Sequence, residues 1–345
     1  MIIAFGSDLH CGKRMYRTDE TGYNKFEHIG YRVLKEYMQA IKDAKPDIAV
    51  FAGDTFDVPD PPTLPIVRYA QALRILEDIP TMAINGNHDF KFSNRKNKCS
   101  ATDLVPHTYF ADYEPKVIEI EDVAFILMPY IYDTVDNIQT YINNCANLAK
   151  SNKCAKKILV THGVTDRYFR DHFVDDPIKL SDEFVQLFDV VVIGHIHTPF
   201  EYWEGKTLVI SPGGMIDYQA YVDRTGIVIL DTDTMKYKRV LVKSPHIIKK
   251  NCDEKNINEV LENVTEDIYH IVFDGNPEVI NNDLFIKAKN EAVNLVIEPV
   301  QHEDTVVGNT EETENKKSLM PDLYSWVKLN HPDNAEDFEK AKNSL

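Results

Sequence analysis

The chain has 345 residues, of which 43% are hydrophobic, and a formal net charge of −17 at pH 7. This length allows one large domain with appendages or two domains, and the hydrophobic share is enough for a real core. No apolar run approaches the ~20 residues that a membrane-spanning helix needs, and the first residues form a strand pattern rather than a secretory signal. We therefore expect a soluble, cytoplasmic protein that does not associate with membranes.

The acidic balance limits the classes of partner. Proteins dedicated to nucleic acid are more often basic, so this charge argues against broad, unaided coating of DNA. It does not exclude an enzyme in which metal ions supply local positive charge. The cysteines never form a C-x-x-C pair, which favours reduced thiols over a disulfide framework; they are Cys11, Cys99, Cys145, Cys154 and Cys252. Cys11, next to His10, is interpreted as structural.

Five short apolar runs, each typical of a buried strand, end in polar clusters. In sheets covered by helices, ligands collect at the carboxyl ends of strands, so these clusters are the candidate functional site. Each cluster alone is more often a turn or a cap, whereas five in one chain indicate a site. Alternation along a strand should place Asp8 with His10, and His195 with His197, on one side. In chain order the clusters contain Asp8 and His10, then Asp54, then Asn87, His88 and Asp89, then His162, and finally His195 and His197.

The donor atoms of these clusters predict the kind of metal. Imidazole nitrogens with carboxylate oxygens suit manganese, iron or zinc, whereas an oxygen-only set suits magnesium or calcium. The candidate ligands are too many for one ordinary site, so we expect two divalent ions that share a carboxylate. Such a pair stays net positive, attracts a phosphate ester and can clamp the attacking and leaving oxygens of an in-line displacement. The candidate ligands are Asp8, His10, Asp54, Asn87, His162, His195 and His197.

In order and spacing, the clusters resemble the five motifs of the calcineurin-like metallophosphoesterases. The motifs read Asp8-Leu9-His10, Gly53-Asp54, Gly86-Asn87-His88-Asp89, His162 and Gly194-His195-Ile196-His197. The resemblance implies that Asp54 bridges two metals. It assigns one metal to Asp8, His10, Asp54 and His197, and the other to Asp54, Asn87, His162 and His195.

The resemblance also implies a catalytic role for His88. In that family the equivalent histidine is not a ligand. It lies beside the scissile phosphate, stabilises its charge and helps to protonate the leaving oxygen, which suits an imidazole whose charge state changes near neutral pH. Asp89 is expected to orient this ring.

Between the clusters, strand patterns alternate with helix patterns. Residues 23–44 carry an amphipathic helical stripe, and residues 64–76 repeat it after a proline-rich turn. Residues 117–130 predict two strands joined by a turn at Glu121-Asp122, residues 135–149 a helix, and residues 208–210, 227–230 and 237–242 further strands. The order predicts an α/β fold for residues 1–244, a layered α/β/β/α sandwich with two mixed sheets inside and helices outside.

The chain changes character after residue 244. Residues 245–298 predict a small α/β capping module, with helices at 257–264 and 282–290 and strands at 268–273 and 293–297. Residues 299–318 are polar and acidic, which is typical of a flexible linker. The apolar residues of the C-terminal segment 319–345 could fold back on their own domain or dock on a partner, and both alternatives stay open.

This layout resembles the SbcD-type nuclease subunits of DNA repair and recombination complexes. The resemblance implies a metal-dependent DNA exonuclease or endonuclease, with Mn²⁺ as the expected ion pair. It implies that the small module selects DNA, that the C-terminal segment binds an SbcC-type coiled-coil ATPase, and that the chain forms a homodimer. The sequence from Gly53 to Asp57, followed by prolines, is more similar to the bacterial and phage branch, whose members work in the cytoplasm of a bacterium or a phage-infected host cell. Other members carry histidine in place of Asp57.

Three groups of basic residues follow the strand ends. They are candidates for guiding phosphate into the site, although each group is also typical of a solvated loop. The groups are Lys13, Arg14 and Arg17; Lys91, Arg95, Lys96 and Lys98; and Arg167 and Arg170. The other histidines, His107 among them, have no motif around them and are expected to be surface or core residues.

Two alternative functions stay open. The first is a phosphodiesterase or phosphatase that acts on a nucleotide or another small phosphoester, and the relative turnover of long DNA and a small aryl phosphodiester would distinguish it. The second is a catalytically idle scaffold subunit that binds the ATPase and DNA ends. A manganese-dependent activity that a chelator abolishes would exclude this second alternative.

Overall fold

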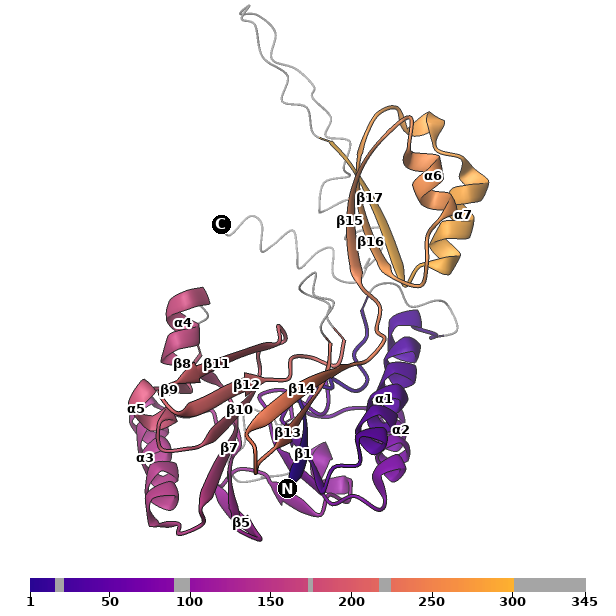
Figure 1. The fold of residues 1–345 in the computed structure, drawn as a ribbon. Helices are drawn as coiled ribbons and strands as arrows, with labels where there is room; N and C mark the ends of the chain where they lie inside the picture. Colours follow the sequence, from indigo (N-terminus) through magenta and orange to yellow (C-terminus); the bar gives the residue numbers. More distant parts are fainter. Residues whose placement is uncertain (16–21, 90–99, 173–175, 217–224, 301–345) are drawn as a thin grey trace, which may run out of the picture. The chain divides into compact units, whose positions relative to one another are not determined.

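The computed structural model describes residues 1–15, 22–89, 100–172, 176–216 and 225–300. Over these ranges the body of the molecule contains two six-stranded sheets (Figure 1). The first sheet has the order β14-β13-β1-β2-β3-β4, and the second has the order β11-β12-β10-β7-β6-β5. Both sheets combine parallel and antiparallel pairs, as predicted from the alternation of strand and helix patterns.

In the first sheet, β1 to β4 run parallel, and the antiparallel pair β13 and β14 extends the sheet beyond β1. The carboxyl ends of β1, β2 and β3 therefore lie at one edge. The strands are β1 (Ile2–Gly6), β2 (Ile48–Ala52), β3 (Thr81–Ile84), β4 (Tyr109–Ala111), β13 (Gly226–Asp231) and β14 (Lys236–Leu241).

In the second sheet, β6, β7, β10 and β12 run parallel, and β5 and β11 pair antiparallel at the two edges. The predicted turn between β5 and β6 is present, with Glu121 in the left-handed region at φ 54°. The strands are β5 (Lys116–Ile120), β6 (Val123–Met128), β7 (Lys156–His162), β10 (Val190–Gly194), β11 (Phe200–Glu204) and β12 (Thr207–Ser211). A separate two-stranded sheet pairs β8 (Val164–Thr165) with β9 (Lys179–Leu180).

Helices lie outside both sheets, which gives the predicted α/β/β/α layers. The helices α1 and α2 lie on one side and α3 and α5 on the other (Figure 1). Helix α1 begins after Asn24, whose side chain accepts the Glu27 N–H, and ends at Lys45 with φ 50°. The helices are α1 (Lys25–Ala44), α2 (Thr63–Leu73) with the 3₁₀ turn Arg74–Leu76, α3 (Val135–Ser151), α4 (Asp166–His172) and α5 (Asp182–Val185). A further 3₁₀ turn spans Ala101–Leu104.

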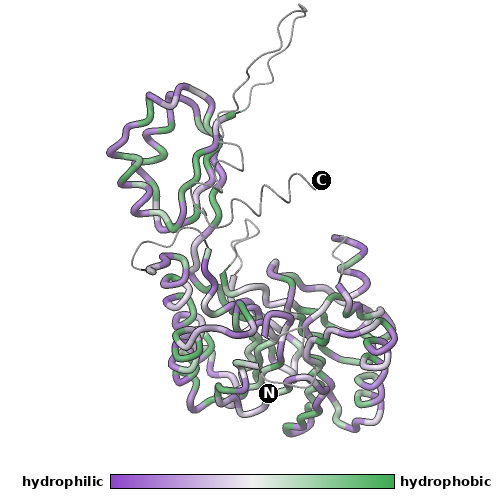
Figure 2. The backbone as a smooth tube through the Cα atoms, turned by 180° about the vertical axis from the view of Figure 1, so that it is seen from behind, coloured by the Kyte–Doolittle hydropathy of each residue, from purple (hydrophilic) through white to green (hydrophobic). Residues whose placement is uncertain are grey.

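Three apolar clusters hold the layers together. One lies between the first sheet and its helices and includes the buried Cys11, one lies between the two sheets, and one lies between the second sheet and α3. In the central cluster, Phe5 and Phe125 are fully buried. The inner strands β2, β6 and β10 are buried and apolar along their whole length, whereas the edge strands β11 and β14 carry exposed polar residues. Figure 2 shows the hydropathy of each residue along the backbone. Among the described residues, no helix is both long enough and apolar enough to cross a bilayer.

The residues after 246 form a sheet of their own. Its three parallel strands are β15 (Ile247–Asp253), β16 (Ile268–Asp274) and β17 (Asn294–Pro299), and its helices are α6 (Ile257–Glu262) and α7 (Asn282–Glu291), with a 3₁₀ turn at Pro277–Val279. Its helices and the strands β16 and β17 agree with the sequence prediction, whereas β15 is an additional strand. Most of the apolar residues of these elements share one cluster, whereas Ile268 and Val293 belong to the cluster of the first sheet. We keep the proposal that residues 245–298 are a distinct module. The C-terminal segment and almost all of the expected linker lie outside the described residues.

Candidate active site

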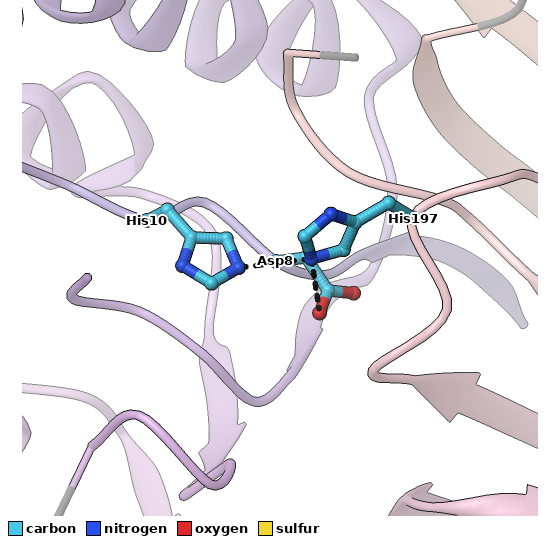
Figure 3. A group of neighbouring side chains, drawn as sticks. All are labelled: Asp8, His10 and His197. Carbon is cyan, nitrogen blue, oxygen red and sulfur yellow. Dashed lines mark hydrogen bonds and ion pairs between the residues drawn. The ribbon is translucent and has the colours of Figure 1, made fainter. Parts of the chain in front are cut away.

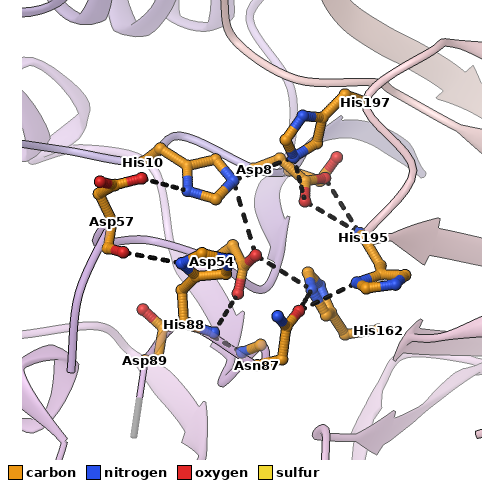
Figure 4. Close-up of polar contacts among 12 residues, drawn as sticks. Asp8, His10, Asp54, Asp57, Asn87, His88, Asp89, His162, His195 and His197 are labelled. Atoms are coloured by element: carbon orange, nitrogen blue, oxygen red, sulfur yellow. Dashed lines mark hydrogen bonds and ion pairs between the residues drawn. The ribbon is translucent and has the colours of Figure 1, made fainter. Parts of the chain in front are cut away.

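The strand ends of both sheets converge on one cluster of polar side chains (Figure 4). From the first sheet, Asp8 and His10 follow β1, Asp54 follows β2, and Asn87 and His88 follow β3. From the second sheet, His162 ends β7, and His195 and His197 follow β10. All seven predicted ligands and His88 therefore lie in one place, although they are spread over nearly 190 residues of sequence.

Two glycines permit the close approach of the sheets at this point. A Cβ atom on Gly194 would lie 1.9 Å from the carbonyl oxygen of Ala52 and 2.6 Å from Nδ1 of His162. A Cβ atom on Gly53, which has φ +89°, would lie 2.4 Å from the same nitrogen. Neither position has room for a side chain. Glycine is therefore required at both positions for the residues of the two sheets to come together.

Several of the polar residues have left-handed backbones. The φ angles are 50° at Asp8, 44° at His10, 52° at Asp54 and 79° at His195. Such angles are uncommon outside glycine and cost of order 1–3 kcal/mol each. Asp8 and His10 lie beyond the end of β1, so their convergence comes from these turns and not from the expected alternation along a strand. Hydrogen bonds from Asp8 N to Gly53 O and from His10 N to Asp54 O, both 3.0 Å, hold the turns.

Asp8, His10 and His197 form the first ligand group (Figure 3). The Nε2 atoms of His10 and His197 are 3.1 Å apart, and Nε2 of His197 is 3.8 Å from Oδ1 of Asp8. Metal–imidazole bonds of about 2.1 Å place neighbouring ligand nitrogens about 3 Å apart. The donor atoms of this group therefore fit one cation.

Asn87, His162 and His195 form the second ligand group. Oδ1 of Asn87 is 2.9 Å from Nε2 of His162 and 2.9 Å from Nδ1 of His195. Two imidazole nitrogens and an amide oxygen thus point at one region, which is the arrangement that a second cation needs.

Asp54 lies between the two groups. Its Oδ2 is 3.6 Å from Nε2 of His10 and 3.4 Å from Nε2 of His162, and the residue is only 2% exposed. Burial by itself raises the pKa of Asp54. The charge and the hydrogen bond of His162 have the larger effect, so the pKa of Asp54 is lowered overall. Burial lowers the pKa of His162, and Asp54 more than reverses that effect. Without a metal, a proton on His162 supplies the positive charge that stabilises the Asp54 carboxylate. A cation bound by both residues would take the place of this proton.

Backbone and side-chain acceptors fix the far nitrogens of two imidazoles. Nδ1 of His162 is 2.8 Å from the carbonyl oxygen of Ala52, and Nδ1 of His10 is 3.2 Å from Oδ1 of Asp57. An N–H on each Nδ1 leaves the Nε2 lone pair free to face the cluster. The donor set therefore fits a pair of divalent ions in protonation as well as in position.

His88 lies beside the first ligand group. Its ring is half-buried and meets the His10 ring edge-on, with ring centroids 4.9 Å apart. Nδ1 of His88 is 2.7 Å from the carbonyl oxygen of Asp57, and its backbone N–H donates to Oδ1 of Asp54 at 2.8 Å. The ring is thus oriented by Asp57.

Asp89 has a different position from the one expected. Its carboxylate accepts hydrogen bonds from the backbone N–H groups of Gly86, Thr55 and Phe56, and the residue is 1% exposed. Burial raises the pKa of Asp89 to about 7, with the charge of Asp54 adding to the effect. Asp89 therefore joins the loops after β2 and β3, and we assign the orientation of His88 to Asp57 instead.

The basic residues near the site have acidic partners. Lys13 pairs with Asp57 at 2.7 Å, and Arg14 pairs with Glu27 at 2.7 Å. Arg167 and Arg170 pair with Glu204 at 3.4 Å and Asp182 at 3.0 Å. These pairs offset the charge expected to guide phosphate. The other candidates, Arg17, Lys91, Arg95, Lys96 and Lys98, lie outside the described residues.

The sequence interpretation missed Tyr130. This residue is 2% exposed, and its ring centroid is 6.1 Å from that of His195 in a stacked arrangement and 6.0 Å from that of His162. It follows β6, which runs parallel to β7 in the second sheet. The same rule that singled out the other strand ends could have identified it, but its aromatic side chain carries no metal-binding signal.

Comparisons with known proteins agree with this geometry. The family model described as calcineurin-like phosphoesterase matches residues 1–199. A relative from Staphylococcus saprophyticus subsp. saprophyticus, named as the D subunit of nuclease SbcCD, is 25% identical over 334 residues, which cover 90% of this chain and 83% of the relative.

Solved structures with a similar fold include TT1561 of Thermus thermophilus, at 12% identity and a TM-score of 0.45, with 70% of this chain and 99% of that chain covered. An archaeal phosphodiesterase is 16% identical with a TM-score of 0.38, over 70% of this chain and 100% of that chain. The family match covers more than half of the residues, and the residues of its site fit divalent metal ions. The chain therefore belongs to the calcineurin-like phosphoesterases, a family of metal-dependent hydrolases.

Proposed function

We propose that this chain is a metal-dependent DNA nuclease that hydrolyses phosphodiester bonds as the nuclease subunit of a complex with an SbcC-type coiled-coil ATPase. The observation that carries the proposal is the convergence of donor atoms from both sheets on two adjacent positions, with Asp54 between them. The nuclease relative supports DNA as the substrate, because its similarity extends over 90% of this chain, well beyond residue 199.

The residues would divide between two divalent ions. The mixture of imidazole and carboxylate donors suits manganese, iron or zinc, and we assign Mn²⁺ from the resemblance to the SbcD-type nucleases. When bound, the ions would neutralise the phosphodiester charge and lower the pKa of the attacking water. Asp8, His10, Asp54 and His197 would hold one ion, and Asp54, Asn87, His162 and His195 the other. The neutral Asn87 keeps the pair net positive, as an anionic substrate requires.

His88 is the proposed proton donor. Its Nδ1 lies 2.7 Å from the Asp57 carbonyl oxygen, which can only accept, so this nitrogen carries the proton and Nε2 is the one that exchanges protons. Protonated Nε2 would donate to the leaving 3′-oxygen, a contribution of about 10²–10⁴-fold in rate. The half-buried position of the ring beside His10 allows substrate to reach it.

The direct test compares substrates on the purified full chain. Linear duplex DNA, short single-stranded DNA and a small aryl phosphodiester are each assayed with Mn²⁺, with Mg²⁺ and with a chelator. We expect Mn²⁺-dependent cleavage of DNA that the chelator abolishes. Efficient turnover of the aryl phosphodiester without cleavage of either DNA would instead identify a small-molecule phosphodiesterase, and no activity on any substrate would indicate a scaffold subunit.

The assembly is tested separately. We propose that residues 245–298 select DNA, that residues 299–318 are a linker, that residues 319–345 bind the ATPase, and that the chain works as a homodimer. A chain that ends at Val300 should keep its cleavage of short single strands and lose the stimulation of duplex cleavage by the ATPase. Equal stimulation of the shortened and full chains would contradict the assignment of the tail.

A further inference from the structure

A buried carboxylate contacts the His195 ring on the side opposite the cluster. Nε2 of His195 is 3.1 Å from Oδ2 of Asp176, whereas Nδ1 of the same ring is 2.9 Å from Oδ1 of Asn87. Asp176 is 6% exposed. We propose that Asp176 is a positioning residue: it accepts the proton of His195 Nε2 and thereby keeps the Nδ1 lone pair directed at the second ion. The inference rests on the proposed role of His195 as a ligand.

The carboxylate of Asp176 is held in place by other groups. Its Oδ1 accepts the backbone N–H of Ile178 at 2.7 Å, and its Oδ2 accepts the hydroxyl of Tyr130 at 3.3 Å. Val164 donates its N–H to the carbonyl oxygen of Ile178 at 3.0 Å. Since Val164 comes two residues after His162, the segment that carries Asp176 is tied to the strand that supplies another ligand.

Tyr130 connects this carboxylate to the rest of the second ligand group. Its ring stacks on His195 at an interplanar angle of 28° and meets His162 edge-on at 81°. Its backbone N–H donates to the carbonyl oxygen of Asn85 at 2.9 Å, just before Asn87. Tyr130 therefore restrains both imidazoles by packing, while Asp176 fixes the rotation of His195.

The setting of Asp176 differs from that of Asp57, the carboxylate behind His10. Asp57 also forms an ion pair with Lys13 at 2.7 Å, which offsets its charge. Asp176 instead contacts a backbone amide, a hydroxyl and the His195 ring. A carboxylate acceptor makes the opposite nitrogen of an imidazole a better metal ligand, and loss of such a partner typically costs 10–100-fold in metal affinity.

The test measures metal binding without substrate. Mn²⁺ is titrated into the chelator-treated full chain and into the D176A, D176N and Y130F variants, by calorimetry and by electron paramagnetic resonance. In D176A we expect the affinity for one of the two ions to fall about 10–100-fold, with the other unchanged. The spectrum of a coupled manganese pair should then give way to that of a single ion. D176N should lose less, because its amide oxygen still accepts a hydrogen bond, and Y130F should lose least.

The matched control is D189N. The Asp189 carboxylate accepts the backbone N–H of Lys157 at 2.8 Å, at the end of the second sheet opposite the site, so this variant should bind both ions normally. Wild-type affinity for both ions in D176A, or an equal loss of both, would overturn the proposal. If D176A does not fold, D176N decides: it should lose part of its affinity for one ion only, and wild-type affinity for both ions or an equal loss of both would overturn the proposal. Failure of the nuclease proposal would appear in the substrate assays and leave this measurement unchanged.

Discussion

The two sheets contribute different chemistry to the site. The first sheet supplies both carboxylates, Asp8 and Asp54, together with the amide of Asn87 and the imidazole of His10. The second sheet supplies three imidazoles, those of His162, His195 and His197. Both carboxylates thus come from one side, and three of the four ligand imidazoles come from the other. The second half has no carboxylate and the first has only one imidazole, so a site that mixes these donors around two divalent ions depends on the junction between the sheets.

The halves also differ in how they are held. In the first, left-handed backbones and backbone hydrogen bonds place Asp8 and Asp54. In the second, acceptors behind the rings set the rotation of His162 and His195. A hydrogen bond joins the halves directly, because the His195 N–H donates to Oδ1 of Asp8 at 2.9 Å. Loss of the acceptor behind His195 should therefore disturb the second half most.

The largest effect is expected for Asp54→Asn, which removes the charge that both halves share. Metal ions in such sites contribute several kcal/mol of transition-state stabilisation, so a weakened pair should lower kcat about 10³-fold or more. Metal analysis after dialysis should show loss of both ions. Full retention of both would show that Asp54 does not bridge the halves.

His88→Ala should separate chemistry from metal binding within the first half. We expect kcat to fall about 10²-fold or more, because the proposed proton donor is lost, while the bound metal stays at the wild-type level. Steady-state kinetics and metal analysis on the same sample provide the comparison. A parallel loss of metal would make His88 a ligand instead of a proton donor.

Gly194→Ala should push the halves apart without changing any donor atom. The added Cβ would meet the Ala52 carbonyl oxygen at 1.9 Å, and overpacking of this kind typically costs 1–3 kcal/mol. Denaturant unfolding should show this loss, and Mn²⁺ affinity should fall with it. Gly30→Ala is the control, since Gly30 lies within helix α1 and the nearest atom to its added Cβ is 3.9 Å away. Equal behaviour of the two variants would contradict the steric account.

The smallest effect concerns a histidine outside the site. Burial lowers the pKa of His107 to about 4 from 6.5, and its ring contacts the Tyr69 hydroxyl and Thr81 Oγ1. As pH falls, the unfolded chain therefore takes up the proton before the folded chain does, so stability should be lost as pH falls from 6.5 toward 4, by about 2 kcal/mol at pH 5. In His107→Gln this part of the pH dependence should disappear. Both proteins are unfolded by denaturant at each pH in the presence of chelator, so the contribution of the ligand histidines is the same in both and cancels. The same pH dependence of stability in His107→Gln and wild type would contradict the prediction.

Sequence patterns alone predicted which strand ends meet, because parallel neighbouring strands end at one edge of a sheet and their polar residues stood out against apolar runs. They did not predict β15, because this edge strand has three consecutive exposed polar residues, Lys249, Lys250 and Asn251, and so lacks an apolar or alternating pattern. The family resemblance led us to expect that Asp89 contacts His88, but the turn after β3 directs its carboxylate to the backbone of Thr55 and Phe56.

The supporting residues were the least predictable part of the site. Asp176 lies in a segment without a strand pattern, and its contact with His195 depends on the pairing of β8 with β9. Asp57 orients His88 through its backbone carbonyl, a group that every residue has. Such contacts arise from the fold and leave no distinctive residue type or spacing in the sequence.

Anomalous diffraction from crystals of the full chain soaked in Mn²⁺ would test the two-sheet metal site most directly. We expect two peaks about 3.5–4 Å apart, one beside His10 and His197 and one beside His162 and His195, with Asp54 contacting both. A single peak, or two peaks that contact residues of only one sheet, would contradict the shared site.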